Sequence, residues 1–178
     1  SQLDLLDERK NPLWRHARRT LYLAKRDGRV VGRVAYIEDD EHIRIHDERI
    51  AFFGFFEADD EEVAGALLEV VEAHARSAGM VAVRGPINGT MNDGAGFQVD
   101  AFDQKPYVLM PQNPPDYPCW VERRGYVKVK DLYAYHFDNR KPISERVARI
   151  AERTAARYEV TVRPADMKRF DREVEILK

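Results

Sequence analysis

The stretch IAFFGFFEADDEEVAGALLEVVEAHARSAGMVAVRGPI, residues 50–87, determines the fold that we expect for this chain. It begins with an apolar run typical of a buried strand, and Gly54 within this run predicts a bulge or the close approach of another backbone. Residues 59–79 predict a helix, because aspartates can cap the start, apolar residues recur at spacings of three and four, and a glycine ends the pattern. Residues 80–87 predict a short buried strand. A right-handed crossover would make the two strands parallel.

The residues before this unit predict a β-hairpin. Two β-rich runs within residues 20–40 are separated by Asp27-Gly28, which is among the strongest short hairpin signals. In the second run, apolar residues occupy both the odd-numbered and the even-numbered positions. These positions face opposite sides of a strand, so we expect both of its faces to be covered. Residues 1–19 are interpreted as an entry segment rather than a complete structural unit.

The residues after the unit alternate between irregular and regular segments. We expect residues 97–117 to be irregular, residues 118–124 to form a short helix that stops at Gly125, and residues 126–138 to form two strands. This order of elements predicts a mixed α/β fold, with a central twisted sheet flanked by helices.

Three further elements are expected toward the end of the sequence, two helices and a strand between them. Residues 140–158 predict an amphipathic helix, and residues 159–178 predict a strand, a Pro-Ala-Asp break and a helix. The inner side of the first helix is expected to carry Ile143, Val147, Ile150, Thr154 and Tyr158.

Charge and apolar content narrow the class of protein. Lys and Arg total 29 against 31 Asp and Glu, which leaves a net charge of -2. Nucleic-acid binding needs a basic excess, so we expect no nucleic-acid partner. The hydrophobic fraction of 44% supplies the core of a folded domain. No apolar run reaches the roughly 18 residues of a membrane span, so we expect no such span and a cytoplasmic protein.

The single cysteine and the scattered histidines argue against disulfide and metal chemistry. Cys119 has no partner for an intrachain disulfide and belongs to no CxxC motif. His42 and His46 are four residues apart, but residues 41–50 predict a polar stretch leading to a turn rather than a helix. We therefore expect no metal site.

The order hairpin, strand, long helix, strand, short helix and two final strands resembles the GNAT N-acetyltransferase superfamily. The resemblance covers roughly residues 20–137, and its most telling parts are YLAKRDGRVVGRVAYI at residues 22–37 and WVERRGYVKVKDLYAYHF at residues 120–137. It implies a GNAT-like acyl-CoA N-acyltransferase fold that lacks the usual first strand and helices.

A second set of motifs resembles, more narrowly, a bacterial GNAT-like family with RGP, N-x-S-x-N-D, NPP and DLYAY motifs in this order. The matching positions are Arg84-Gly85-Pro86, Asn88, Thr90, Asn92-Asp93, Gly96, Phe102-Asp103, Pro106, Met110-Pro111, Asn113-Pro114-Pro115 and Asp131-Leu132-Tyr133-Ala134-Tyr135.

The resemblance also implies a domain organisation. Residues 1–139 correspond to one GNAT-like domain, residues 140–158 to a connecting helix, and residues 159–178 to a strand-helix piece. This piece either begins a second GNAT-like half or supplies the first strand and helix of the first half. If residues 159–163 complete the sheet of a neighbouring chain, a homodimer results.

The implied activity is transfer of an acyl group from acetyl-CoA or another acyl-CoA to a small-molecule amine, with no cofactor bound tightly. In the superfamily the thioester lies along a bulged fourth strand, which corresponds here to Phe55 and Phe56. The pyrophosphate lies at the start of the next helix, where Gly65 matches a glycine of the family motif. Glu57 occupies the position at which several family members carry a general base.

Two departures from the family pattern leave an alternative open. The aromatic acid that reprotonates the leaving thiolate is replaced by Val121, and Tyr117 is the nearest substitute. Residues 58–65 carry four carboxylates in place of the Q/R-x-x-G-x-G/A motif, and these would repel a pyrophosphate. The alternative is a non-catalytic GNAT-like module that binds a ligand or partner through a degenerate CoA site.

The loop RGPINGTMNDGAGF, residues 84–97, has neither Walker nor GxGxxG spacing. In a GNAT-like fold it would lie beside the acyl-transfer cleft, with Arg84, Asn88, Asn92 and Asp93 as candidate ligand contacts. The other interpretation is a multi-turn loop whose Asn and Asp side chains bond their own backbone.

Overall fold

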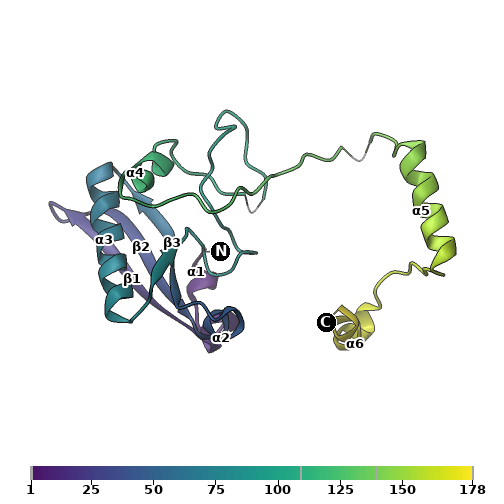
Figure 1. Ribbon diagram of the computed structural model, residues 1–178, viewed down its shortest axis with the longest axis horizontal. Coiled ribbons are helices and arrows are strands. Elements are labelled where there is room, and N and C mark those ends of the chain that lie inside the picture. Colours follow the sequence, from purple (N-terminus) through teal and green to yellow (C-terminus); the bar gives the residue numbers. More distant parts are fainter. Residues whose placement is uncertain (1, 109, 139, 178) are drawn as a thin grey trace. The chain divides into compact units, whose positions relative to one another are not determined.

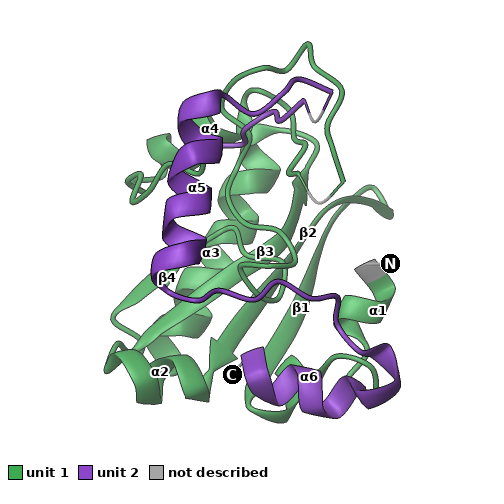
Figure 2. Ribbon diagram, turned by 90° about the vertical axis from the view of Figure 1, so that its right-hand side faces the viewer, with its two compact units in different colours: residues 1–132 green, residues 133–178 purple. Residues whose placement is uncertain are grey.

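The computed structural model describes residues 2–108, 110–138 and 140–177, and the chain divides into two compact units (Figures 1 and 2). Unit 1 is Ser1–Leu132 and contains the sheet, whereas unit 2 is Tyr133–Lys178 and contains helices joined by irregular chain. The helical elements are α1 (Gln2–Leu6), η1 (Pro12–Arg15), α2 (Asp40–His46), α3 (Glu61–Ser77), α4 (Tyr117–Arg123), α5 (Glu145–Arg157), η2 (Met167–Arg169) and α6 (Phe170–Leu177).

The sheet has four strands in the order β1-β2-β3-β4, namely β1 (Ala17–Arg26), β2 (Arg29–Asp39), β3 (Ile50–Ala58) and β4 (Ala82–Arg84). β1 and β2 form the predicted hairpin, since Asp27 and Gly28 both have positive φ, 51° and 78°, as a tight hairpin turn requires. β3 pairs antiparallel with β2 and parallel with β4. The predicted parallel pairing of the two strands and the mixed α/β class are therefore confirmed.

Helix α3 covers one face of the sheet (Figure 1). Its N-cap is Asp60, whose side chain accepts a hydrogen bond from the Val63 amide at 2.9 Å, and Gly79 follows its end with φ 70°. His74 faces the sheet from this helix: its ring stacks on Tyr36 with 3.9 Å between centroids, and Nδ1 lies 2.8 Å from the Tyr22 hydroxyl.

The core consists of two clusters, one on each face of the sheet. Val34 and Tyr36 of β2 belong to the cluster beneath α3, whereas Ala35 and Ile37 belong to the other. This alternation confirms that both faces of β2 are covered. The second cluster is closed by α1 and η1, which contribute Leu5, Leu6 and Trp14. The first residues are thus a structural part of unit 1 and not only an entry segment.

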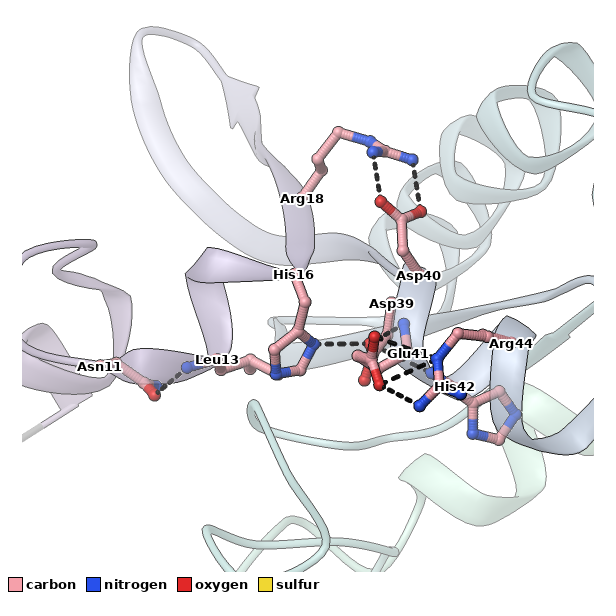
Figure 3. Close-up of polar contacts among 9 residues, drawn as sticks. All are labelled: Asn11, Leu13, His16, Arg18, Asp39, Asp40, Glu41, His42 and Arg44. Carbon is pink, nitrogen blue, oxygen red and sulfur yellow. Dashed lines mark hydrogen bonds and ion pairs between the residues drawn. The ribbon is translucent and has the colours of Figure 1, made fainter.

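Residues 40–46 form helix α2, so the predicted polar turn was wrong. The Asp39 carboxylate accepts hydrogen bonds from the amides of Glu41 and His42, and it also contacts Nδ1 of His16 at 2.8 Å (Figure 3). The cap is the last residue of the preceding strand, and a distant histidine holds it in place. The polar composition of residues 41–50 does not reveal such a cap, which explains why the helix was not predicted. The rings of His42 and His46 consequently lie 4.5 Å apart, centroid to centroid.

Predictions about strands were wrong in three segments, although β4 itself is a strand as predicted. β4 is not buried: it lies at the edge of the sheet, and its neighbour Val81 is 80% exposed. The described residues 126–138 and 160–166 contain no strand. A suitable pattern of side chains is not sufficient to form a strand, because the backbone must also form hydrogen bonds with a neighbouring strand.

The helices of unit 2 form where they were predicted. Ser144 caps α5 by accepting from the Val147 amide. The side expected to be inner is nevertheless exposed, including Val147 at 53% and Ile150 at 54%. Across the described ranges, no helix combines the length and the apolar character needed to cross a membrane.

Candidate functional site

A bulge in β3 is the centre of the candidate site. β3 pairs with β2 at Gly54 and again at Glu57, with two residues between them on β3 and only one on β2. These two residues are Phe55 and Phe56, whose side chains enter the two opposite core clusters. Phe55 has φ 50°, in the left-handed region that a bulky residue adopts only where the surroundings hold it. The predicted bulge is confirmed.

The loop after β4 packs directly on this bulge. A Cβ added at Gly54 would lie 1.8 Å from the Ile87 carbonyl oxygen, so only glycine permits this approach. The Ile87 amide donates to the Phe53 carbonyl at 2.8 Å, and Asn88 Oδ1 accepts from the Phe55 amide at 2.7 Å. Asn88 therefore occupies one of the backbone donors that the bulge exposes.

The four loop residues nominated as ligand contacts do not converge. Asp93 accepts from both the amide and the hydroxyl of Thr90 and so closes the loop on itself. Arg84 lies 3.5 Å from the Glu48 carboxylate, and Asn92 is exposed. Asn88 is the one of the four that reaches the bulge. These contacts favour the multi-turn interpretation for most of the loop.

Glu57 and Tyr117, nominated as catalytic, lie beside each other. The Tyr117 hydroxyl is 3.2 Å from Glu57 Oε2, and it also lies 2.8 Å from the amide and 3.0 Å from the carbonyl oxygen of Ala58. Glu57 has a side chain that is 53% exposed, and Arg33 approaches it to 3.8 Å. The site thus joins an accessible carboxylate to a buried phenol at the end of β3.

The environment of Tyr117 keeps its hydroxyl protonated. Burial raises the pKa of Tyr117, against the opposing hydrogen bond from the Ala58 amide, and the nearby Glu57 carboxylate raises this pKa further. The ring is held by Phe56 and Phe97, at centroid distances of 5.3 and 5.9 Å. A phenol held in this way can donate a proton but does not act as a base at neutral pH.

The acidic start of α3 is partly neutralised by arginines from elsewhere in the chain. Arg26 contacts Asp60 at 2.7 Å and Glu62 at 3.1 Å, and Arg123 contacts Glu61 at 2.7 Å. Sequence analysis missed both arginines, because they are 34 and 62 residues away from the acids they pair with. The Asp60 carboxylate already accepts the hydrogen bond of the Val63 amide. A phosphate at the start of this helix would therefore be repelled by a carboxylate.

Replacing Asn88 by alanine is expected to lower the free energy of unfolding of the chain by about 1–3 kcal/mol, because the partly buried Phe55 amide loses its acceptor. Chemical denaturation measures this change. Asn92→Ala is the matched control, since that side chain is exposed, and it should leave stability unchanged. Equal stability of the two variants would contradict the described packing of the loop on the bulge.

Fold and site together define a mixed α/β protein with a bulged central strand that presents a carboxylate next to a buried tyrosine. No family model and no solved structure matches the chain. Among curated proteins it is similar to Bacterial ceramide synthase of Caulobacter vibrioides (strain NA1000 / CB15N), with 36% identity over 98% of this chain and 46% of the relative.

It is also similar to Protein YghO of Escherichia coli (strain K12), with 30% identity over 95% of this chain and 43% of the relative. The chain therefore spans less than half the length of these two relatives.

Proposed function

We propose that this chain is part of an N-acyltransferase of GNAT-like architecture, which forms an amide from an acyl-CoA thioester and an amine. The contact between Glu57 and the Tyr117 hydroxyl at the end of the bulged strand carries the proposal. The similarity to a ceramide synthase supports it, because ceramide is the amide of a long-chain amine and a fatty acid. A long-chain amine is accordingly the first acceptor to test.

The two side chains supply the proton transfers that amide formation requires. The amine nitrogen attacks the thioester carbon, the C–N bond forms and the C–S bond breaks. Glu57 takes the proton that the nitrogen loses, and Tyr117 donates a proton to the departing thiolate. Their 3.2 Å contact then returns the proton from Glu57 to Tyr117.

The contacts already made within the chain limit how acyl-CoA binds. The Phe55 amide donates to Asn88, so a thioester carbonyl at the bulge must use another donor or displace this side chain. The carboxylate of Asp60 holds the Val63 amide. We therefore place the pyrophosphate away from the start of α3.

The acidic start of α3 favours a second candidate, a GNAT-like module that binds its ligand without catalysing transfer. Asp60 and its neighbours replace the phosphate-binding motif, and Val121 is buried where the family carries its aromatic acid. The two candidates differ in one measurable step, the release of free thiol.

The experiment incubates the chain with acetyl-CoA or long-chain acyl-CoAs and a long-chain amine. Free thiol is followed by its reaction with a chromogenic disulfide, and the amide by mass spectrometry. We expect amine-dependent thiol release with at least one acyl-CoA. Calorimetric binding of acyl-CoA without thiol release would favour the second candidate, and the absence of both binding and release would overturn the proposal.

A further inference from the structure

Helix α5 separates its apolar and charged side chains into distinct strips. With 3.6 residues per turn, Val147, Ile150, Ala151 and Thr154 lie within an arc of about 100°. Arg146, Arg149, Arg153 and Arg157 form an adjoining strip of about 80°, which we call the arginine strip. The two acids of the helix, Glu145 and Glu152, lie on the opposite pole from the apolar strip.

Within the described residues of unit 2, no carboxylate pairs with the arginine strip. Arg149 contacts only the Glu145 backbone carbonyl, at 3.4 Å, and Arg157 stands over the Tyr158 ring at 5.3 Å. Arg146, Arg149 and Arg153 line one hollow together with Ile150. Arg163 of the same unit, by contrast, is paired with Glu173 at 2.8 Å. Four uncompensated cations therefore adjoin an exposed apolar strip.

We propose that α5 lies on the surface of a membrane that contains anionic phospholipids. The apolar strip would enter the boundary between headgroups and acyl chains, and the arginine strip would contact lipid phosphates while its stems extend along the apolar layer. The two acids point away from such a surface, so they do not oppose its negative potential. A helix of 13 residues lying in the surface does not need the length of a membrane span.

Two other occupants of this face fit less well. A second copy of α5 offers no carboxylate to the arginine strip, because both acids lie opposite the apolar strip. A protein groove that binds an amphipathic helix usually takes bulky anchors at spacings of three, four and seven, whereas this strip has only Val147 and Ile150 as larger apolar side chains within the helix.

Binding of α5 to a membrane would depend on these charges and on the apolar strip, and it does not require that the chain catalyses acyl transfer. If the chain transfers an acyl group to a long-chain amine, membrane binding would also bring it to its substrate, since such amines partition into membranes. A chain that binds vesicles without acyl transfer would support the membrane proposal alone.

The test is sedimentation of the whole chain with vesicles of phosphatidylcholine alone, or of phosphatidylcholine mixed with phosphatidylglycerol. We expect binding to the mixed vesicles, weakened by added salt because exposed charges are screened. Arg146→Glu combined with Arg153→Glu should lower this binding about tenfold or more. Lys25→Glu with Arg29→Glu changes the net charge equally in the β-hairpin of unit 1 and should leave binding within about twofold of the original chain.

Ile150→Asp tests the apolar strip, and it should also reduce binding to mixed vesicles. Circular dichroism confirms that each variant keeps its helix content. The proposal is overturned if the chain does not sediment with the mixed vesicles, or if both double variants lose binding to them equally. It is also overturned if Ile150→Asp dissociates a dimer in light scattering while vesicle binding is absent.

Discussion

In the proposed acyl transfer, replacing Glu57 by glutamine is expected to lower the rate of amide formation by about 10²–10⁴-fold, the usual contribution of a positioned proton-transfer group. Glutamine keeps the shape of the side chain and an oxygen within reach of Tyr117, but it cannot take the proton that the attacking amine loses. Because the Glu57 side chain is 53% exposed, the substitution should leave the free energy of unfolding nearly unchanged.

The measurement is the initial rate of thiol release at saturating acyl-CoA and amine, so that the effect is seen in kcat. Glu69→Gln is the control, since it removes an exposed carboxylate of α3 and should keep the full rate. Tyr117→Phe is the complementary variant: we expect a similar loss of kcat together with a stability loss of about 1–3 kcal/mol, because the buried Ala58 amide loses its acceptor. A full rate in Glu57→Gln would remove Glu57 from the mechanism.

Replacing Gly54 by alanine is expected to lower the free energy of unfolding by about 3 kcal/mol or more. The added Cβ would lie 1.8 Å from the oxygen and 2.6 Å from the carbon of the Ile87 carbonyl group. These are backbone atoms held by the 2.8 Å hydrogen bond from the Ile87 amide to Phe53. Relief of the clash therefore requires the loop to leave β3, with loss of the Asn88 contact to the bulge.

Gly65→Ala is the matched control for this substitution. No atom lies within 4 Å of a Cβ at Gly65, and this residue is in the interior of α3. Alanine should therefore stabilise the chain by about 0.5–1 kcal/mol through its higher helix propensity. Urea denaturation of both variants gives the comparison. If Gly54→Ala were as stable as the original chain, the loop would not pack on β3 as described.

Short sequence patterns correctly predicted the elements whose conformation depends on neighbouring residues, such as the hairpin turn and the start of α3. The turn at Asp27-Gly28 requires positive φ at two successive positions, and Asp-Gly is a pair that supplies it. The start of α3 depends on a carboxylate three residues before an amide, and Asp60 stands at that spacing. Local patterns failed at residues 126–138, because a strand needs a partner strand that the alternation of side chains does not specify.

For the candidate site, local sequence patterns specified the residue types and the position of the bulge: a glycine inside an apolar run, a carboxylate at the strand end, and an aromatic residue at the start of a short helix. Packing of the elements against one another brings the Tyr117 hydroxyl to Glu57, 60 residues earlier, and brings arginines to the acids at the start of α3. The spacing of residues along a helix or strand specifies neighbours within that element. Contacts between elements depend on how the core packs, and that is set by the whole of unit 1.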